Sequence, residues 1–368
     1  MKYKFLKEFC DINMGQSPNS KTYNEQGDGL PFYQGNADFG KIHPKTRIWC
    51  SAPVKKAEAE DILISVRAPI GAMNIASEKC CIGRGVAALT PKEEKCDRKF
   101  LYYALESKVK ELMLQGTGST FKAINKKILE QTHIPEYNID KQRYVANILS
   151  KVDLLIDKKE QQIEKTSELV KSRFIEMFDG EYPEETLFNL CNIIDYRGKT
   201  PEKVESGLPF ITAKNVKMHH MALEPREYIS KETYDKVMVR GFPKEGDVVF
   251  TTEAPLGNVC RIPHFDTEFY IGQRIVTMQT EELNPIYLEY ALSAEEFVRK
   301  YMRKSSGSTV KGIRVRLLEQ LTIPVPLRVL QDDFANFVLQ TDKSKLAVQK
   351  SLDELETLKK SLMQEYFG

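Results

Sequence analysis

Residues 138–180 read NIDKQRYVANILSKVDLLIDKKEQQIEKTSELVKSRFIEMFDG, without a proline or an internal glycine. Apolar residues recur at every seventh position along this stretch, at Leu149, Ile156, Ile163, Val170 and Met177. Glu, Lys and Gln are prominent on the other faces, so the pattern predicts an α-helix with one apolar seam. With a rise of 1.5 Å per residue, about 40 residues make a rod of roughly 60 Å, and its seam needs a partner.

Residues 327–368 carry a second seam of the same kind and are the expected partner. We therefore predict that the two stretches pair in one coiled coil, the alternative being two unrelated surface helices. The predicted seam residues are Leu149, Ile156, Ile163, Val170, Val348, Leu352, Leu355 and Leu362. Neighbouring apolar residues, among them Leu155 and Leu169, are expected to widen the stripe.

Four sequence blocks occur twice, in the same order. LPFYQG (30–35) corresponds to LPFITA (208–213), and DILISVRAPIGAM (61–73) corresponds to DVVFTTEAPLGNV (247–259). CIGRGVAAL (81–89) corresponds to YIGQRIVTM (270–278), and GSTFKAINKKILEQTHIP (118–135) corresponds to GSTVKGIRVRLLEQLTIP (307–324). A repeat this long indicates a duplicated domain followed by a helix.

Each copy is predicted to be a mixture of short strands and helices. Apolar, β-branched strands are expected at 61–66 and 247–252, each followed by a sharp Ala-Pro-x-Gly turn. Single strands are expected at 82–89 and 271–279, and single helices at 98–114 and 285–303. The predicted division is a domain at 1–137, a helix at 138–180, a second domain at 181–326 and a helix at 327–368.

The composition is that of a globular protein, with 41% hydrophobic and 29% charged residues. No apolar run reaches the length of a membrane span, and the first residues lack a signal peptide's apolar block, so we expect a cytoplasmic protein without membrane contact. Seven cysteines without a CxxC motif are expected to be reduced thiols, and no metal site is predicted. The net charge of +2 does not by itself indicate nucleic-acid binding.

Catalytic motifs are missing from the sequence. GTGST (116–120) lacks the lysine and the spacing of a phosphate-binding loop, and the five histidines have no HExxH spacing. NPIY (284–287) is similar to a methyltransferase motif but lacks its second proline, and Asn as a helix cap followed by Pro is a sufficient explanation of it. The chain is therefore predicted not to be an enzyme, and no cofactor is expected in it.

Polar and basic residues gather in the loops of both copies. Arg and Lys suit guanine edges and phosphates, and Asn and Gln suit adenine, although solvated loops have the same composition. The two GST-x-K turns offer hydroxyls and a cation to a phosphate, or they are simply helix caps. The candidate DNA-binding residues are Gln34, Asn36, Lys41, Lys45, Arg47, Arg67, Arg84, Ser119, Thr120, Lys122, Lys214, Asn215, Lys217, Arg261, Gln273, Arg274, Ser308, Thr309 and Lys311.

With these features the chain resembles the specificity subunit of type I restriction-modification systems. The resemblance rests on DILISVRAPIG (61–71), on the two GST…IP blocks that each precede a long helix, on ILSKVD (148–153), and on the two-copy layout. The second copy departs from the first, since FVLQTD (337–342) replaces ILSKVD and Glu253 stands where the first copy has Arg67. Corresponding loops are therefore not required to make the same contacts.

The resemblance implies an α+β fold of two similar target-recognition domains, separated by two long antiparallel helices and related by a pseudo-two-fold repeat. Each domain would read one half of a split, asymmetric sequence in double-stranded DNA. Two adenine-methyltransferase subunits, which would carry S-adenosylmethionine, and restriction subunits would dock on this frame. Four aromatic or Met residues near the helix ends are docking candidates or ordinary packing residues: Phe174, Phe178, Met363 and Phe367.

Two other classes of function make different demands on the sequence. A methyltransferase or nuclease in its own right would need a cofactor loop and catalytic residues, which the sequence does not show. A coiled-coil scaffold with two protein-binding domains fits the modest net charge. A DNA reader differs from such a scaffold because it must gather its cations on one face of each domain.

Overall fold

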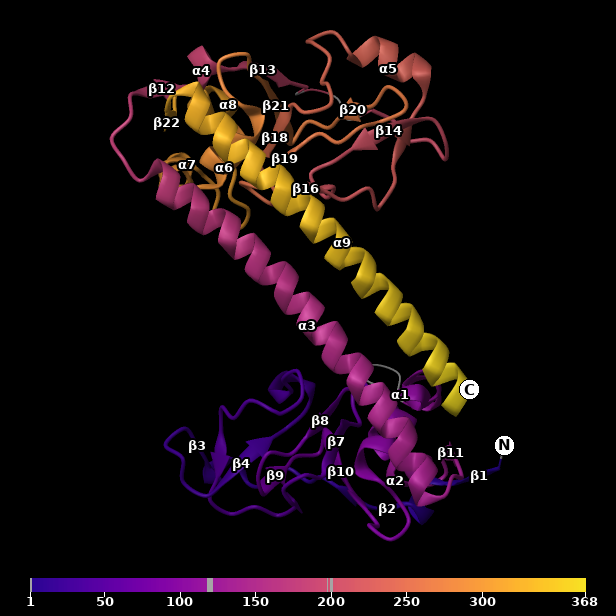
Figure 1. The fold of residues 1–368 in the computed structure, drawn as a ribbon. Coiled ribbons are helices and arrows are strands. Elements are labelled where there is room, and N and C mark those ends of the chain that lie inside the picture. The colour runs from indigo at the N-terminus through magenta and orange to yellow at the C-terminus, as the bar shows by residue number, and fades with distance from the viewer. Residues whose placement is uncertain (1, 118–121, 197, 199–200) are drawn as a thin grey trace. The chain divides into compact units, whose positions relative to one another are not determined.

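The computed structural model describes residues 2–117, 122–196, 198 and 201–368. The chain is α+β and divides into two compact units (Figure 1). Unit 1 contains residues 1–161 and 349–368, and unit 2 contains residues 162–348. Each unit thus holds one set of sheets together with one segment from each of two long helices, α3 (Ile139–Phe178) and α9 (Arg328–Phe367).

The central sheet of unit 1 is antiparallel, with the strand order β2-β10-β7-β8. These strands span Cys10–Met14 (β2), Val86–Pro91 (β10), Ile62–Ser65 (β7) and Met73–Ile75 (β8). Strand β7 is buried on both faces: Ile62 and Ile64 face one cluster and Leu63 faces another. Burial on both faces explains why the strand reads as a continuous apolar run.

A second sheet of unit 1 has the order β3-β5-β4-β9-β6, in which only the β4–β9 pair is parallel. Its strands are β3 (Tyr23–Asn24), β5 (Trp49–Cys50), β4 (Leu30–Tyr33), β9 (Cys80–Ile82) and β6 (Lys56–Ala57). The ends of the domain are joined by the antiparallel pair β1 (Tyr3–Phe5) and β11 (His133–Pro135). The remaining helical elements are η1 (Leu6–Glu8), η2 (Ser20–Thr22), η3 (Asn36–Asp38), α1 (Arg98–Gln115) and α2 (Lys126–Glu130).

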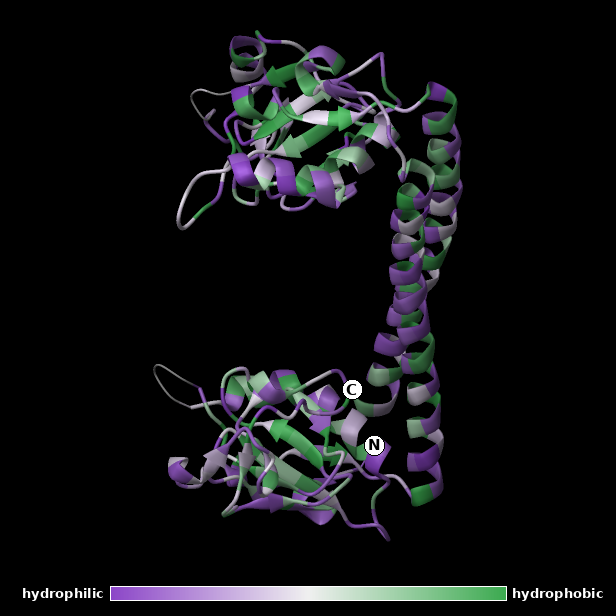
Figure 2. Cartoon of the chain, turned by 90° about the vertical axis from the view of Figure 1, so that its left-hand side faces the viewer, coloured by the Kyte–Doolittle hydropathy of each residue, from purple (hydrophilic) through white to green (hydrophobic). Residues whose placement is uncertain are grey.

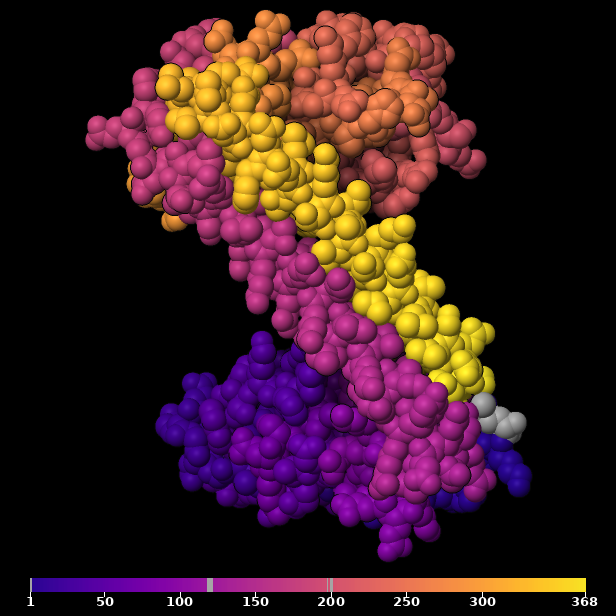
Figure 3. Space-filling view, viewed as in Figure 1, coloured from indigo at the N-terminus to yellow at the C-terminus, as the bar shows by residue number. Residues whose placement is uncertain are grey.

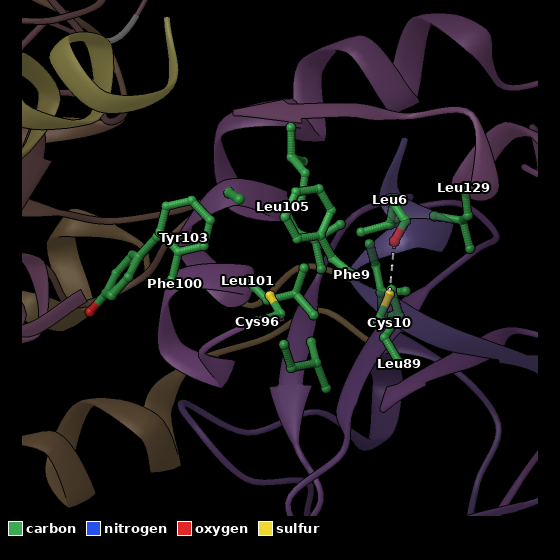
Figure 4. Close-up of a cluster of buried hydrophobic side chains, with 14 of the residues drawn as sticks. Leu6, Phe9, Cys10, Leu89, Cys96, Phe100, Leu101, Tyr103, Leu105 and Leu129 are labelled. Atoms are coloured by element: carbon green, nitrogen blue, oxygen red, sulfur yellow. Dashed lines mark hydrogen bonds between the residues drawn. The ribbon is translucent and has the colours of Figure 1, made fainter. Parts of the chain in front are cut away.

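Helix α1 covers one face of the central sheet and forms the main core of unit 1 (Figure 4). Phe100, Leu101 and Leu105 of this helix are fully buried against Leu6 and Leu89. The thiol of Cys10 donates a 3.5 Å hydrogen bond to the carbonyl of Leu6 in the same cluster. Figure 2 shows hydrophobic residues concentrated in the strands of both units, as a core between sheet and helix requires.

Unit 2 has a central sheet with the strand order β13-β21-β18-β19, in which every pair is antiparallel. Its strands are β13 (Asn192–Asp195), β21 (Ile275–Gln279), β18 (Val248–Thr251) and β19 (Val259–Arg261). A smaller sheet, β17-β14-β20, again contains one parallel pair, between β14 and β20. These strands are β17 (Tyr228–Ile229), β14 (Leu208–Ile211) and β20 (Tyr270–Ile271).

The other elements of unit 2 are two strand pairs and five short helices within the described residues. The pairs are β12 (Glu184–Thr186) with β22 (Thr322–Pro324), and β15 (Val216–Lys217) with β16 (His220–Met221). The helices are α4 (Leu187–Leu190), α5 (Lys231–Val237), α6 (Pro285–Ser293), α7 (Glu295–Lys304) and α8 (Val315–Leu318).

Three sequence predictions about these elements were wrong. The single helix expected at 285–303 is interrupted at Ala294, whose ψ of 143° is extended. The break lets Phe297 and Tyr301 of α7 pack edge-on against Phe250 of β18, at ring-centroid distances of 6.4 and 5.5 Å. The single strands expected at 82–89 and 271–279 are each two strands that belong to different sheets: β9 and β10 are joined by a turn at residues 83–85, and β20 and β21 by a turn at residues 272–274.

Within each unit the segments of α3 and α9 lie side by side and run antiparallel (Figure 3). In unit 1 the Lys359 ammonium lies 3.0 Å from the Asp153 carboxylate, while Lys141 lies over the ring of Tyr366. In unit 2 Lys345 donates to the Ser167 hydroxyl at 3.0 Å. The helix segments therefore contact each other within both units through polar as well as apolar side chains.

The predicted seam positions differ in burial. Leu149, Val170, Val348 and Leu352 are buried, and Ile156, Ile163, Leu355 and Leu362 are partly buried. The expected widening of the stripe is wrong for Leu155 and Leu169, which are 46% and 55% exposed. Two helices bury only a narrow strip between them, so positions flanking the strip face solvent wherever no other element covers them.

Candidate functional site

A parallel strand pair brings the first group of candidate residues together in unit 1. Because β4 and β9 are parallel, their carboxyl ends meet at one edge of the sheet, with Gln34 following β4 and Arg84 following β9. The amide N–H of Gly83 donates to the Tyr33 carbonyl at 2.8 Å and fixes the two ends together. They form an open pocket of about 530 Å³, which also receives Asn36, Arg47 and Arg67.

The charge in this pocket is positive. Asp38, whose carboxylate is largely buried, accepts hydrogen bonds from the Arg47 guanidinium and from the Gln34 backbone N–H, at 2.7 Å for the latter. Its negative charge is thereby compensated. Arg67 and Arg84 are exposed, and no ion pair is found for either within the described part of the chain. Two guanidiniums without acidic partners suit a phosphate or a guanine edge.

Unit 2 forms its pockets at the corresponding edge, where β14 and β20 end. One pocket of about 270 Å³ is lined by Lys203, Lys214, Gln273 and Arg274 among others. An adjoining pocket of about 570 Å³ shares Gln273 and Arg274 with it and adds Glu253. This region is less positive than its counterpart, because Glu253 faces Arg274 and Lys203 pairs with Glu227 at 2.8 Å.

The two GST-x-K turns contain six candidate residues, three of them in unit 2. Ser119 and Thr120 lie outside the described residues, and Lys122 is exposed. In unit 2, Ser308, Thr309 and Lys311 are exposed on a loop closed by backbone hydrogen bonds between Ser306 and Gly312. The helix-cap alternative is wrong for Ser308 and Thr309, because the cap of α8 is Arg314. They remain candidates for phosphate contact, on a loop whose residues Ser306, Gly307 and Val310 line the larger pocket.

Three candidate residues are engaged by other groups of their own unit. Lys41 forms ion pairs with Asp157 and Glu160 of α3, and hydrogen bonding by these carboxylates raises the pKa of Lys41. Asn215 is only 2% exposed, and its amide bonds within its own loop, with Thr212, Ala222 and Pro225. The prediction of DNA contact is therefore wrong for Asn215, because its polar atoms are buried and satisfied.

Arg261 is also engaged by carboxylates of its own unit. Its Nε lies 2.6 Å from Glu289 of α6, which is 1% exposed, and its Nη2 lies 3.7 Å from Asp342 of α9. A buried carboxylate needs this cation, so Arg261 has a structural partner inside its own unit, and its DNA contact stays a prediction. Lys45 and Lys217 are exposed but line none of the pockets described above.

The aromatic residues near the helix ends are packing residues rather than a docking surface. Phe367 is 1% exposed and packs against Phe100, while Met363 packs against the same core. Phe174 and Phe178 contact Phe334 of α9, with ring centroids 5.3 and 5.6 Å apart. Phe174 and Phe178 also contact Tyr287 of α6, so aromatic residues hold each sheet domain on its own helix segments.

NPIY (284–287) proves to be a helix start. Asn284 caps α6 by accepting from the Ile286 N–H at 2.9 Å, and Pro285 occupies the first turn. Among the described residues no cluster of three or more His, Cys, Asp or Glu side chains could hold a metal ion. Over the same residues, no helix combines the length and the apolar character that crossing a membrane requires.

Comparison with known proteins identifies the region that contains the first pocket. Residues 1–165 match the model of the type I restriction modification DNA specificity domain. These residues belong to that family. The specificity domain thus includes the sheets of unit 1, the guanidinium-lined pocket and the first part of α3.

Specificity subunits are found as relatives over part of the chain and, at lower identity, over nearly all of it. A Methanocaldococcus jannaschii protein named as the MjaX type I restriction enzyme specificity subunit is 43% identical over 167 residues, which is 45% of this chain and 39% of that relative. The MjaIX specificity subunit of the same organism is 22% identical over 396 residues, covering 98% of this chain and 91% of the relative. A solved type I restriction-modification S subunit from M. genitalium shares the fold over the whole chain, with a TM-score of 0.61, 17% identity and 96% coverage of that chain.

Two pocket residues of interest were missed by sequence reasoning. Arg314 lines the larger pocket of unit 2 at the position where the specificity domain has Asn125. Asn125 caps α2 through its side chain, whereas Arg314 makes no such cap bond. The sequence could have indicated Arg314, because the first copy has a helix-capping Asn at the equivalent position and the second copy has an arginine. Lys203 carried no comparable signal, because it lies outside the repeated blocks.

Proposed function

We propose that this chain is the DNA-binding specificity subunit of a type I restriction-modification enzyme and reads a bipartite, asymmetric target. The observation that carries the proposal is the convergence of Arg67, Arg84 and Gln34 in one open pocket of a specificity domain. Guanidinium and amide groups are the side-chain groups that read guanine and adenine in the major groove. A protein-binding scaffold has no need of two exposed guanidiniums without acidic partners in one pocket.

The second half of the target would be read by unit 2. Support comes from the common plan of the units, because the central sheets have corresponding strand orders and each smaller sheet has one parallel pair at the pocket edge. We propose that residues 1–137 and 181–326 are two copies of one recognition domain. Their pockets differ in charge, as recognition of two different half-sites requires.

The remaining parts of the chain would have a structural role. Residues 138–180 and 327–368 would form a coiled-coil spacer that fixes the distance between half-sites, and adenine-methyltransferase and restriction subunits would dock on the chain. Methyl transfer would then belong to the partner, which would carry S-adenosylmethionine, and this chain would supply only binding. No residue cluster described above calls for a catalytic role.

Sequencing of modified bases tests the proposal directly. DNA is compared from cells that produce this chain with a type I methyltransferase subunit encoded beside it, and from cells that produce the methyltransferase alone. N6-methyladenine at one split motif, present only with this chain, is the expected result. A soluble, co-purifying pair that adds no methylation would refute DNA recognition and favour the scaffold.

The spacer role has its own test. Seven residues that continue the heptad pattern are inserted after Ile163 and after Leu352, which preserves the apolar pattern and lengthens each helix by about 10 Å. The half-site sequences should stay the same while their separation grows. A change in the half-site sequences themselves would contradict the spacer role.

A further inference from the structure

One position of the fold carries opposite charges in the two units. Arg67 follows the central strand β7, and Glu253 follows the corresponding strand β18. Backbone bridges join Arg67 to Ala123 and Glu253 to Gly312, in the loops that precede α2 and α8. The two side chains thus start from equivalent places, and each lines its unit's pocket.

The backbone around both residues is held by the same hydrogen bonds. In unit 1 the Val66 N–H donates to the Gly85 carbonyl, and the Ile124 N–H donates to the Val66 carbonyl, both at 2.9 Å. In unit 2 Thr252 takes the place of Val66: the Thr252 N–H donates to the Arg274 carbonyl, and the Ile313 N–H donates to the Thr252 carbonyl, again both at 2.9 Å. Bonds on both sides of the strand end hold this position on a rigid element, as discrimination between bases requires.

The surroundings leave both side chains accessible. Within the described residues Arg67 has no acidic partner, and the carboxylate of Asp38 in its pocket is already engaged by Arg47. Glu253 and Arg274 face each other, but their Nε and Oε1 atoms are 3.9 Å apart and both side chains are about half exposed. This separation exceeds a hydrogen bond, so the carboxylate can accept from another donor.

An exposed carboxylate in a DNA-facing pocket has few suitable partners. Phosphates repel it, whereas the N4 amino group of cytosine is the donor that Glu characteristically binds in the major groove. An arginine at the same place is suited to O6 and N7 of guanine. Opposite charges at equivalent places therefore fit opposite members of a G·C pair.

We propose that this position is a specificity determinant in each half-site, with Arg67 selecting guanine and Glu253 selecting cytosine. The proposal rests on the DNA-recognition function proposed above and assigns one base of each half-site to one named side chain. Arg274, beside Glu253, is free to contact the DNA backbone once the carboxylate binds the base.

The test compares methylation motifs made by the full chain and its variants with the same methyltransferase subunit. Glu253→Gln keeps the size of the side chain but removes its charge, and Arg67→Gln removes the guanidinium. Each variant should lose discrimination by roughly 5- to 150-fold at a single position, within one half-site only. Loss of one specified base should raise the number of modified motif sites about fourfold.

A charge exchange sharpens the test. Arg67→Glu should change the preferred base at its position from guanine to cytosine and leave the second half-site unchanged. The matched controls are Arg143→Gln on α3 and Glu282→Gln before α6, both exposed and outside the pockets, which should keep the wild-type motif. Each half-site that a variant leaves unchanged shows that the variant is folded.

The outcomes separate this proposal from the general one. If Glu253→Gln and Arg67→Gln both keep the wild-type motif, the assignment of these two residues is overturned and the specificity function stands. Uniform weakening at every position would assign both residues to backbone contact and also overturn it. If the wild-type chain produces no methylation motif with the methyltransferase, both the proposed function and the assignment are overturned.

Discussion

Replacement of Phe367 by alanine should destabilise unit 1 strongly. Phe367 lies near the end of α9, is 1% exposed, and packs against Phe100 with ring centroids 5.3 Å apart. Removing a buried phenylalanine side chain costs about 3 to 5 kcal/mol, since both apolar burial and packing are lost. Because the end of a helix can relax into part of the cavity, we expect about 3 kcal/mol.

The single tryptophan makes the effect measurable in the full chain. Trp49 lies on β5 in unit 1, so its fluorescence during urea unfolding reports on that unit. With a slope of roughly 2 to 3 kcal/mol per molar urea, a loss of 3 kcal/mol moves the midpoint down by about 1 to 1.5 M. Circular dichroism of the native variant checks that the helices remain.

Leu358→Ala is the matched control on the same helix. Leu358 is 46% exposed, so its truncation should change stability by at most about 0.5 kcal/mol, or about 0.2 M in midpoint. Equal midpoints for the two variants would refute the reasoning, because the aromatic contact between α9 and the sheet domain would then contribute nothing.

Three further predictions follow from charges and thiols. Lys359 lies between Glu106 and Asp153; burial lowers the pKa of its ammonium, but the two carboxylates raise it by more. Lys359→Met should therefore lower the free energy of unfolding by about 1 to 2 kcal/mol in the same urea assay. An unchanged midpoint would contradict this. His264 pairs with Glu245, which raises the pKa of the imidazole above 6.5; the stabilisation is complete below that pH and is lost as the pH rises through the folded pKa. In an NMR titration Glu245→Gln should lower this pKa, and no change would rule out the pairing. All seven cysteines are buried free thiols, and burial raises the pKa of five of them to about 12. A thiol reagent should therefore label essentially none of the seven in the native protein and all of them in denaturant. Rapid labelling without denaturant would show that the thiols are accessible.

The sequence predicted those helices and strands well whose pattern depends only on neighbouring residues. A continuous heptad pattern without proline indicated α3 and α9 almost to their ends, because helix periodicity is a property of neighbouring residues. The strands β7 and β18 were indicated by short β-branched runs. Comparison of the two copies also located the loops that carry the candidate residues.

Three-dimensional packing decided which of those residues are available. Lys41 and Arg261 look like loop residues in the sequence, yet the structure pairs them with carboxylates that lie far away in the chain, and Asn215 is buried by hydrogen bonds within its own loop. The sequence shows charge but not the partner that compensates it. The same holds for Phe367, whose burial depends on a sheet domain more than 200 residues earlier in the chain.

What the sequence determined by itself is the periodic part of this protein and its recurring sequence blocks: two long helices, the strands that the recurring blocks indicate, and the polar composition of their loops. Only the tertiary structure decided that β9 and β10 separate into different sheets, so that the turn at residues 83–85 brings Arg84 into the pocket with Gln34 and Arg67. The physical reason is that a parallel strand pair joins segments about 50 residues apart, and no local pattern encodes which strand ends will meet.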